Sequence, residues 1–348
     1  MAMDMDRDMN VARVIVVTPV YEDREASTRL FAELAQSLGD SVHVVAVDDG
    51  SLRQPVEASA IARAGVSGTV LRLRRNVGHQ RAIAIGLAYV AERLSDEQRV
   101  VVMDSDGEDL PSSIAELLQP LDASEDIDVA VARRKSRVET FKFKAFYAVY
   151  KRVFQLLTGR AISFGNFMAL RASAVRRLVA MHELPVHVAG CVIASRLRAH
   201  VCHIARGPRY AGQSKMNFVG LVLHGFKGMM VFAEDVVVRV GIACSVVAGM
   251  AIALAAMAVA LRVLGYSSPG WFSVALGILV IMFFQMSALA LMTLMQSSNK
   301  NGYVVPLRTH LELIAEALDV LPAHAMAPAQ EMAGSHVTQG PGSIRPAA

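Results

Sequence analysis

The chain has 348 residues, 53% of them hydrophobic, and a formal net charge of +4 at pH 7. This composition is too apolar for an ordinary water-soluble enzyme, and the mild positive charge favours anionic lipid headgroups over nucleic acid as a partner. The three cysteines, Cys191, Cys202 and Cys244, lack metal-ligand spacing, so we expect reduced, structural thiols. Residues 1–12 begin with the acidic, polar stretch MAMDMDRDMN, which is unlike a signal peptide and is expected to be flexible.

Apolar runs of strand length alternate with helical patterns in the first part of the chain. The expected strands are ARVIVVTPVY, VHVVAVDDGS, TVLRLRR, RVVVMDSDGED and IDVAVARR. Helical periodicity is expected between them, at 25–38, 54–64, 77–93 and 112–118. This alternation is typical of a mostly parallel sheet with helices on both faces, and we predict such an α/β domain over residues 13–215.

Polar residues gather where the predicted strands end. They are Pro19, Tyr21 and Glu22 after the first strand, Asp48, Asp49 and Ser51 after the second, Arg75, Asn76, Gly78 and His79 after the third, Asp104 and Asp106 after the fourth, and Arg133 after the fifth. Each could be a turn residue or a helix cap, but ligands bind at this edge of open α/β sheets. The chain has neither a Walker lysine loop nor G-x-G-x-x-G, which disfavours NTPases and dinucleotide enzymes.

The most concentrated charge lies in VVVMDSDGEDLP, where Asp104, Asp106, Glu108 and Asp109 fall within six positions. Carboxylates this close repel one another unless a cation compensates them. Hard oxygen ligands suit Mg²⁺ or Mn²⁺, which usually arrive with the phosphates of a substrate. The alternative is a solvated acidic turn before a helix that begins at Pro111.

Two uncharged runs lie toward the C-terminus, Val240–Leu261 with 22 residues and Trp271–Met295 with 25. At a rise of about 1.5 Å per residue, each can cross a hydrocarbon core of about 30 Å. We predict transmembrane helices at 240–262 and 271–296, preceded by amphipathic juxtamembrane helices at 216–239.

Basic residues flank the outer ends of the predicted membrane hairpin: Lys215, Lys227 and Arg239 before it, and Lys300 and Arg308 after it. The positive-inside rule places both ends in the cytoplasm. We therefore expect a multi-pass protein of the cytoplasmic (inner) membrane, with the α/β domain of residues 13–215 in the cytoplasm. The tail, 297–348, is expected to be cytoplasmic and disordered after about residue 322.

The stretch FKFKAFYAVYKRVFQLL repeats aromatic residues at helical spacing, from Phe143 to Phe154. A basic helix with an aromatic face can lie in the bilayer interface. It can equally pack on the sheet with snorkelling lysines. The sequence leaves both alternatives open.

Several motifs together resemble a known family. VVTPVYED, VDDGS, RRNVGHQRAIAIGL and MDSDGEDLP resemble the motifs of family 2 glycosyltransferases with the GT-A fold. FGNFMALRASAV and RYAGQSKMNF, followed by paired membrane helices, resemble the branch that includes dolichyl-phosphate mannose synthase and bacterial polyprenyl-phosphate glycosyltransferases. The resemblance covers roughly residues 12–300. It implies a Rossmann-like GT-A sheet and inverting transfer of a sugar from a UDP- or GDP-linked donor to a polyprenyl phosphate, such as undecaprenyl phosphate, at the cytoplasmic membrane face.

The resemblance also implies roles for individual residues. The nucleotide-sugar would contact Pro19, Tyr21, Glu22, Asp49, Asn76, Gly78 and Arg133. Asp104 and Asp106 would hold the diphosphate through Mg²⁺ or Mn²⁺, with Glu108 where relatives often have a glutamine ligand. Arg209 and Lys215 would face phosphates, although both could instead be juxtamembrane lipid contacts without a part in catalysis.

The chain departs from the family pattern at FGNF, where relatives usually carry an aspartate and this chain has Asn166. Asparagine cannot act as a general base. A hydroxyl acceptor must lose a proton as it attacks, and a base typically accelerates that step by about 10²–10⁴-fold. A phosphate monoester, with a second pKa of about 6, is already ionised at neutral pH. Asn166 therefore fits a phosphate acceptor better than a hydroxyl acceptor.

Alternatives remain open from the sequence. The enzyme could glycosylate a hydroxyl on a lipid or glycan, with Glu183 or His187 as a substitute base, although these two are more typical of loop or interface residues. The chain could also be a non-catalytic membrane scaffold with a nucleotide-sugar-binding fold. It lacks the Q-x-x-R-W signature of processive synthases, since its only tryptophan is Trp271. Small residues such as Gly241, Ala248 and Gly249 would allow close helix packing in a homo-oligomer.

Overall fold

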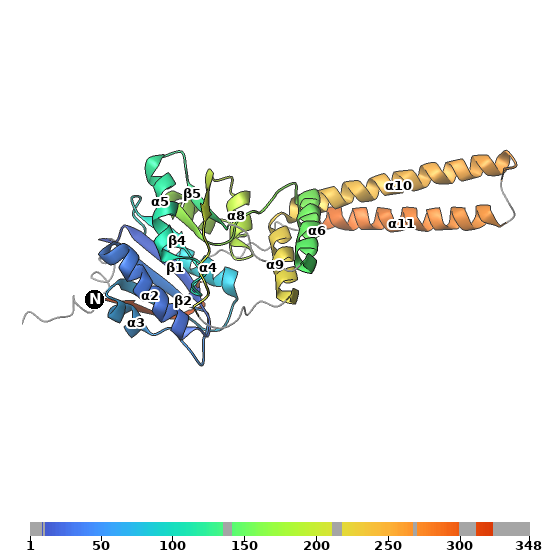
Figure 1. Cartoon of the computed structure of the whole chain (residues 1–348). Helices are drawn as coiled ribbons and strands as arrows, with labels where there is room; N and C mark the ends of the chain where they lie inside the picture. Colours follow the sequence, from blue (N-terminus) through green and yellow to red (C-terminus); the bar gives the residue numbers. More distant parts are fainter. Residues whose placement is uncertain are drawn as a thin grey trace, which may run out of the picture.

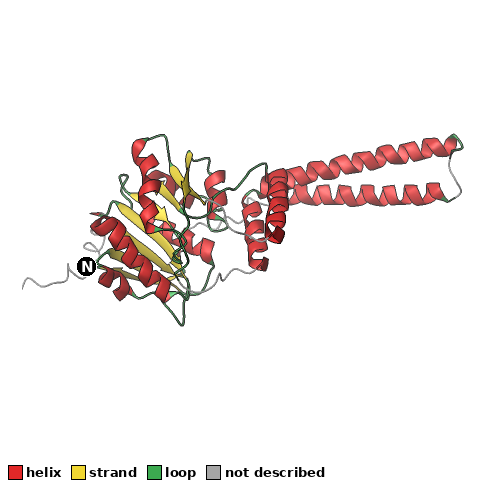
Figure 2. Cartoon of the chain, in the orientation of Figure 1, coloured by secondary structure: helices red, strands yellow, loops and turns green. Residues whose placement is uncertain are grey.

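The computed structural model describes residues 9, 11–134, 141–210, 218–266, 270–298 and 311–322. A sheet domain with helices on both faces lies beside two shorter helices, from which a long hairpin of two helices extends (Figures 1 and 2). The predicted fold class, an α/β domain followed by membrane-type helices, is confirmed.

The described strands form one eight-stranded sheet in the order β7-β5-β6-β4-β1-β2-β3-β8. The strands are β1 (Val14–Val20), β2 (Val42–Asp48), β3 (Ser67–Leu73), β4 (Arg99–Val102), β5 (Val129–Arg134), β6 (Met168–Arg171), β7 (Ala199–Ile204) and β8 (Ile314–Val320). Pairing is parallel among β1, β2, β3 and β4 and between β5 and β7, whereas β6 and β8 run antiparallel to their neighbours. All five predicted strands are present, and β6, β7 and β8 were not predicted.

Helices cover both faces because the central strands are apolar on both sides. One face packs against α2 (Arg24–Leu38), α3 (Ala58–Ala64) and α5 (Ile114–Ala123). The other packs against α4 (His79–Ala91), α7 (Ala172–Val179) and α8 (Val188–Ala194). Alternate residues of β1 enter opposite cores: Ile15 and Val17 join one, and Val14 and Val16 join the other.

Two helices begin later than predicted, α3 at 58 rather than 54 and α4 at 79 rather than 77. The reason is that carboxylates hold the preceding backbone in loops. Glu22 accepts hydrogen bonds from the N–H groups of residues 52–54. Asp49 accepts hydrogen bonds from those of Val77 and Gly78. The predicted helix at 112–118 is also longer, since the short 3₁₀ turn η2 (Pro111–Ser113) leads into α5.

Strand β8 belongs to the segment that was expected to be a cytoplasmic tail. It pairs antiparallel with β3, and Asp319 Oδ1 accepts a hydrogen bond of 2.6 Å from Thr69 Oγ1. Arg72 and Glu316 form an ion pair of 3.0 Å beside it. The predicted disorder after residue 322 lies outside the described residues.

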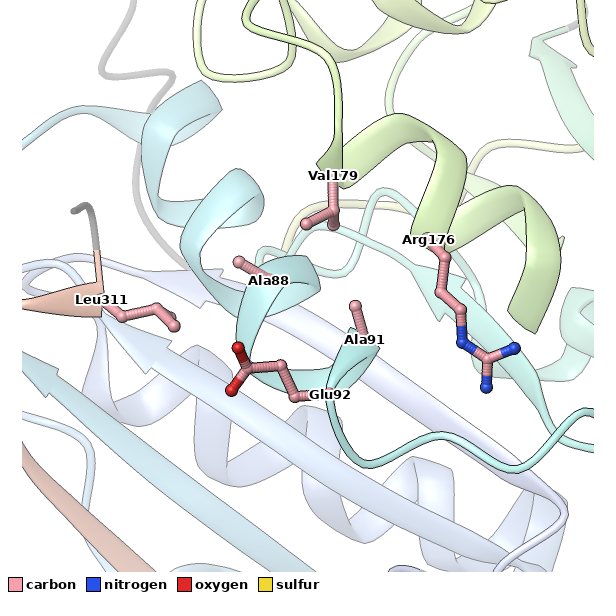
Figure 3. A pocket seen from close by; sticks show the side chains of 6 residues that line it. All are labelled: Ala88, Ala91, Glu92, Arg176, Val179 and Leu311. Atoms are coloured by element: carbon pink, nitrogen blue, oxygen red, sulfur yellow. The ribbon is translucent and has the colours of Figure 1, made fainter. Parts of the chain in front are cut away.

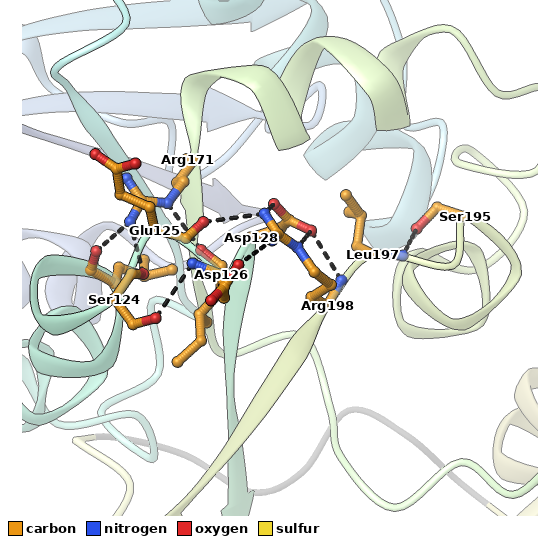
Figure 4. Close-up of polar contacts among 10 residues, drawn as sticks. Ser124, Glu125, Asp126, Asp128, Arg171, Ser195, Leu197 and Arg198 are labelled. Atoms are coloured by element: carbon orange, nitrogen blue, oxygen red, sulfur yellow. Dashed lines mark hydrogen bonds and ion pairs between the residues drawn. The ribbon is translucent and has the colours of Figure 1, made fainter.

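Two arginines bind neighbouring loops at the end of the sheet opposite the polar strand ends (Figure 4). Arg171 donates from Nε to the carbonyl of Ile127 at 2.8 Å. Arg198 donates two hydrogen bonds to the Asp128 carboxylate, from Nε at 3.0 Å and from one terminal nitrogen at 2.8 Å. The hydrogen bond from Arg198 lowers the pKa of the Asp128 carboxyl. These contacts tie the loop before β5 to β6 and β7.

The helices between the sheet and the hairpin pack on one another. These are α6 (Phe141–Thr158) and α9 (Phe218–Val231), and α10 (Ala233–Val263) follows directly. Tyr150 Oη donates to the carbonyl of Gly225 at 3.0 Å, and the ring of Phe154 meets that of Phe232 edge-on. The aromatic side chains described on α6 therefore pack against α9 and the start of α10 rather than against the sheet.

The hairpin consists of α10 and α11 (Trp271–Ser298), the two described helices that are long and apolar enough to cross a membrane. Only 22% of the apolar window of α10 and none of that of α11 is buried, unlike the core helices of soluble proteins. Helix α10 begins before the predicted residue 240, because Glu234, Asp235 and Arg239 continue the helix beyond its apolar part. Since β8 rejoins the sheet after α11, the chain enters and leaves the hairpin on the same side (Figure 1).

The buried histidine of β2 leads to a prediction about acid stability. His43 is 4% exposed and lies 3.0 Å from Ser67 Oγ and 3.1 Å from Thr69 Oγ1. Burial lowers its pKa to about 4, whereas an unfolded histidine titrates near 6.5. The stability that neutral His43 contributes is therefore complete above about pH 6.5 and is lost as the pH falls toward 4.

We expect His43→Gln, which does not titrate in this range, to lose about 2.5 kcal/mol less unfolding free energy than the wild type between pH 7 and about pH 4.5. Chemical unfolding of the detergent-solubilised protein, followed by circular dichroism, measures the difference. His200→Gln, on the exposed part of β7, is the matched control and should keep the wild-type pH dependence. An unchanged dependence in His43→Gln would contradict the assignment.

Candidate active site

Sheet topology explains why polar residues distant in sequence meet at one edge. The strands β1, β2, β3 and β4 are parallel, so the residues that follow them share this edge. Because β6 is antiparallel to β4, the edge also receives the loop that precedes β6, which contains Asn166. Strands β5 and β7 end there as well, and they bring Arg133 and Arg209. The edge thus collects side chains from both halves of the sheet domain.

The four carboxylates after β4 have different environments. Asp109 is 2% exposed and accepts a hydrogen bond from the backbone N–H of Asp104 at 3.0 Å, so it shapes the loop. The side chains of Asp104 and Asp106 are 24% and 18% exposed at the edge. Only part of the acidic cluster can therefore face a ligand.

Basic side chains lie against the carboxylates of this cluster. His79 Nε2, at the start of α4, lies 3.1 Å from Asp104 Oδ1. Arg209 lies 2.7 Å from Asp106 Oδ2, and Arg206 pairs with Glu108. Burial alone would lower the pKa of His79, but the charges of Asp104, Asp106 and Asp109 and the hydrogen bond to Asp104 outweigh it, so the pKa of His79 is raised.

A short segment after β7, residues 205–210, delivers both arginines. Its backbone binds the acidic loop, with Gly207 N–H donating to the carbonyl of Glu108 at 3.0 Å and Tyr210 N–H to that of Asp106 at 2.8 Å. Tyr210 Oη donates to Glu33 on α2. The Tyr210 ring leaves no room for a side chain at position 107, where a Cβ would lie 2.6 Å from the ring, and Gly107 has φ +87°. These contacts hold residues 205–210 against the loop that follows β4.

The loops after β1 and β2 are held by carboxylates that the resemblance assigned to the nucleoside. Both oxygens of Glu22 accept backbone N–H groups of residues 52–54, and these bonds, with that from Leu52 the strongest, lower its pKa. Glu22 also has φ +46°, a strained value for a residue with a side chain. Asp49 is 3% exposed and binds the N–H groups of Val77 and Gly78 at 2.7 and 3.0 Å, while burial raises its pKa. Both carboxylates shape the rim, and contact with a nucleoside stays a prediction.

Asn166 lies within a chain of polar contacts. Its Oδ1 accepts a hydrogen bond of 3.2 Å from Gln80 Nε2, and its Nδ2 lies 3.1 Å from His79 Nε2. Gln80 Oε1 in turn accepts from the backbone N–H of Val188 at 2.7 Å. The amide is held beside Asp104 by its neighbours, which suits a positioning group.

Two carboxylates at the edge are suited to a divalent cation. Asp104 and Asp106 offer hard oxygen atoms at the edge, and they fit Mg²⁺ or Mn²⁺ as two ligands when diphosphate oxygens complete the shell. Among the described residues no cluster of three or more His, Cys, Asp or Glu side chains is assembled for a metal. The predicted third ligand, Glu108, is paired with Arg206 instead. An ion at Asp106 would also have to displace Arg209.

The remaining predicted site residues are placed as follows. Pro19 is buried within β1, Tyr21 is 44% exposed beyond it, and Asn76 and Arg133 are exposed at the edge. Lys215 lies outside the described residues. Gln80 and Arg206, which were not predicted as site residues, also meet there, as does His79, which the sequence placed at this edge without a role. The only sequence signals for them were VGHQR after the third strand and two arginines flanking Gly-Pro in RGPRY.

A surface hollow of about 180 Å³ lies away from this edge (Figure 3). It is lined by Ala88, Ala91, Glu92, Arg176, Val179 and Leu311, at the end of α4 rather than at its start. It contains none of the groups that compensate the acidic cluster. The candidate active site is therefore the carboxyl edge of the sheet.

Comparison with known proteins gives the family. Residues 15–183 match the family model described as glycosyl transferase family 2. This domain thus belongs to glycosyltransferase family 2, and the predicted enzyme class is confirmed: the protein is a glycosyltransferase.

Solved structures with a similar fold include glucosyl-3-phosphoglycerate synthase from Mycobacterium tuberculosis in complex with Mn²⁺ and uridine-diphosphate-glucose, with a TM-score of 0.46 and 16% identity over 69% of this chain and 83% of that one. The same synthase in complex with phosphoglyceric acid has a TM-score of 0.45 and 16% identity over 69% and 84%. A mycobacterial protein has a TM-score of 0.45 and 13% identity over 69% and 78%. Likeness at this level carries no information on the substrate of this chain.

The pairing of Arg209 with Asp106 predicts competition with metal. We expect Arg209→Ala to bind Mn²⁺ about fivefold more tightly in the absence of nucleotide, because a part-exposed ion pair worth about 1 kcal/mol no longer occupies Asp106. Calorimetric titration with Mn²⁺ measures the affinity. Arg198→Ala, which removes an arginine–carboxylate pair at the opposite edge, is the control and should leave the affinity unchanged. Weaker Mn²⁺ binding by Arg209→Ala would contradict the competition.

Proposed function

We propose that this glycosyltransferase moves a sugar, with inversion, from a nucleotide-sugar to a polyprenyl phosphate at the cytoplasmic face of a membrane. The observation that carries this proposal is the position of α9. This helix leads directly into the apolar hairpin, and it contacts the sheet domain at His187, close to the candidate active site. A membrane-bound acceptor would therefore meet the donor at this edge.

The donor would lie across the carboxyl edge of the sheet. The loops held by Glu22 and Asp49 would take the nucleoside, with Tyr21, Asn76 and Gly78 on the same rim. Asp104 and Asp106 would hold Mg²⁺ or Mn²⁺, and an ion bound there neutralises the charge of the diphosphate leaving group. Arg209 and Arg206, once displaced from the carboxylates, would pair with phosphate oxygens. Arg133 and Lys215 would extend this cationic surface.

The acceptor would be a group that needs no general base. Asn166 occupies the place where an aspartate could have served, and its amide oxygen accepts a hydrogen bond from Gln80, while its nitrogen lies 3.1 Å from His79 Nε2. A phosphate monoester is ionised at neutral pH and can attack the anomeric carbon directly. Catalysis would then rest on alignment and charge neutralisation, in a single in-line displacement that inverts the configuration.

The proposal that the enzyme acts at a membrane is supported by exposed apolar residues on the outer face of α9. Leu223, Phe226 and Met230 are 55%, 55% and 64% exposed and recur at helical spacing, with Lys227 beside them. Such a face suits the boundary between headgroups and acyl chains. With both ends of the hairpin on the side of the sheet, and basic residues around them, the sheet domain would be cytoplasmic.

The metal-binding role predicts the effect of one substitution. We expect Asp104→Ala to lower metal-dependent sugar transfer by about 100-fold or more, because an ion that stabilises the leaving group contributes several kcal/mol. The assay is transfer of radiolabel from nucleotide-sugar to lipid in membranes. Asp126→Ala, on an exposed loop at the opposite edge, is the control. Wild-type turnover in Asp104→Ala would overturn the site assignment.

The same assay identifies donor and acceptor. Membranes are incubated with a panel of radiolabelled UDP- and GDP-sugars, and the labelled lipid is isolated. A polyprenyl-phosphate sugar releases its label in mild acid far more readily than an ordinary glycoside does. Label in an acid-stable glycoside would instead support a hydroxyl acceptor. If neither product forms and calorimetry finds no binding of UDP, GDP or Mn²⁺, the chain acts as a scaffold.

A phosphate acceptor also predicts the result of restoring the aspartate. We expect Asn166→Asp to lower transfer to lipid phosphate by roughly tenfold, since a second carboxylate beside Asp104 repels the incoming phosphate. A hydroxyl acceptor would give the opposite result, because the new carboxylate could act as a base. Comparing kcat for Asn166→Asp and for Asn166→Gln, which keeps the amide, separates the effect of charge from that of shape.

A further inference from the structure

Two imidazoles join the catalytic domain to the membrane-proximal helix. His187, just before α8, is 6% exposed. Its Nε2 lies 3.2 Å from Nε2 of His224 on α9, and the two ring centroids are 4.5 Å apart. The sequence leaves His187 as either a substitute base or an interface residue. In the structure it lies at the interface between the start of α8 and α9.

The hydrogen bonds around His187 define its tautomer. Its Nδ1 accepts the backbone N–H of Gly190 at 3.0 Å and therefore carries no proton. In the neutral ring the proton lies on Nε2, which donates it to His224 Nε2. Burial lowers the pKa of His187 to about 4, so the ring is neutral at physiological pH. The pair is therefore a directed hydrogen bond rather than a repulsion between two cations.

The pair continues the polar chain that begins at the acidic cluster. The N–H of Val188, the residue after His187, donates to Gln80, which binds Asn166, which contacts His79 beside Asp104. His224 lies near enough to the edge that the charge of His79 helps to lower its pKa, after burial, while that of Asp104 opposes the change. The contact at α9 and the reacting edge are thus connected through these side chains and the backbone N–H of Val188.

The inner face of α9 is shaped for this contact. Gly228, one turn after His224, lies under the His187 ring, and a Cβ there would be 3.5 Å from the ring. Val231 packs against Gly190, and Gly225 lies against Tyr150 of α6. Small residues at this spacing let α9 approach closely, while the apolar residues Leu223, Phe226 and Met230 remain exposed. One face of α9 thus meets the domain and the other is free for lipid.

The geometry points to His224 as a positioning residue: its hydrogen bond with His187 holds α9 against the catalytic domain, so that a lipid phosphate entering along α9 is presented to Asn166 and Asp104. This inference rests on the proposed function for its substrate. His224 takes part in no chemical step, because its imidazole only holds α9 in position.

The test uses the full-length protein in nanodiscs and two variants of one residue. His224→Leu fills the volume without a hydrogen-bond acceptor, whereas His224→Gln offers an oxygen to His187. We expect His224→Leu to lower kcat for transfer to lipid phosphate roughly tenfold, because the buried His187 donor loses its partner and α9 is no longer held in place. The Kd for the donor nucleotide and Mn²⁺ should stay unchanged. His224→Gln should keep at least about half of the wild-type kcat. His203→Leu, an exposed histidine on β7, is the control.

Hydrogen exchange provides a second measurement that does not depend on turnover. Amide exchange over residues 218–231 should become faster in His224→Leu and stay slow in His224→Gln. Equal behaviour of the two variants, or an unchanged kcat in His224→Leu, would overturn the inference. If the wild type transfers sugar to no lipid phosphate, the proposed function fails, and the exchange of α9 alone decides whether the pair positions the helix.

Discussion

Crowded negative charge at the end of β4 is the constraint on which this structure depends. Asp104, Asp106 and Glu108 can share one loop only because cations from elsewhere in the chain meet them. His79 comes from the start of α4, and the segment after β7 supplies the two arginines. That segment is in turn latched to α2 through Tyr210. If the proposed metal ion and diphosphate bind here, they would replace these side chains as the partners of the carboxylates.

The antiparallel strand β6 connects this charge balance to the rest of the molecule. Its direction brings Asn166 to the edge, between the carboxylates and the amide of Gln80. Through Gln80 and the N-terminus of α8, the edge is linked to His187 and then to α9. The site for a water-soluble donor and the helix that leads into the apolar hairpin therefore share a single polar network. In the proposed reaction, this network would link the donor site to the helix along which the lipid approaches.

After the hairpin, the chain returns to the sheet, so the hairpin begins and ends on the side of the sheet domain. Strand β8 follows α11 and pairs with β3, where Thr69 and Asp319 form a short hydrogen bond. Both described parts of the chain that flank the hairpin, α9 before it and β8 after it, contact the sheet domain. His43 on β2 is buried, and its imidazole contacts Thr69 on β3. It therefore packs on the side of the sheet where β3 pairs with β8. Topology and side-chain packing thus agree on which side of the hairpin the domain lies.

The sequence by itself determined the parallel core, the acidic cluster and the two apolar helices, because valine runs, helical periodicity and long uncharged stretches are local patterns. It did not reveal β6 or β8, since short segments such as MALR and IAEALDV become strands only through pairing with partners far away in the chain. Nor did it show that Glu22 and Asp49 bind backbone N–H groups, which depends on the course of neighbouring loops. Only the tertiary structure decided which cation meets which carboxylate and that His187 meets His224, because those contacts follow from the order and direction of the strands.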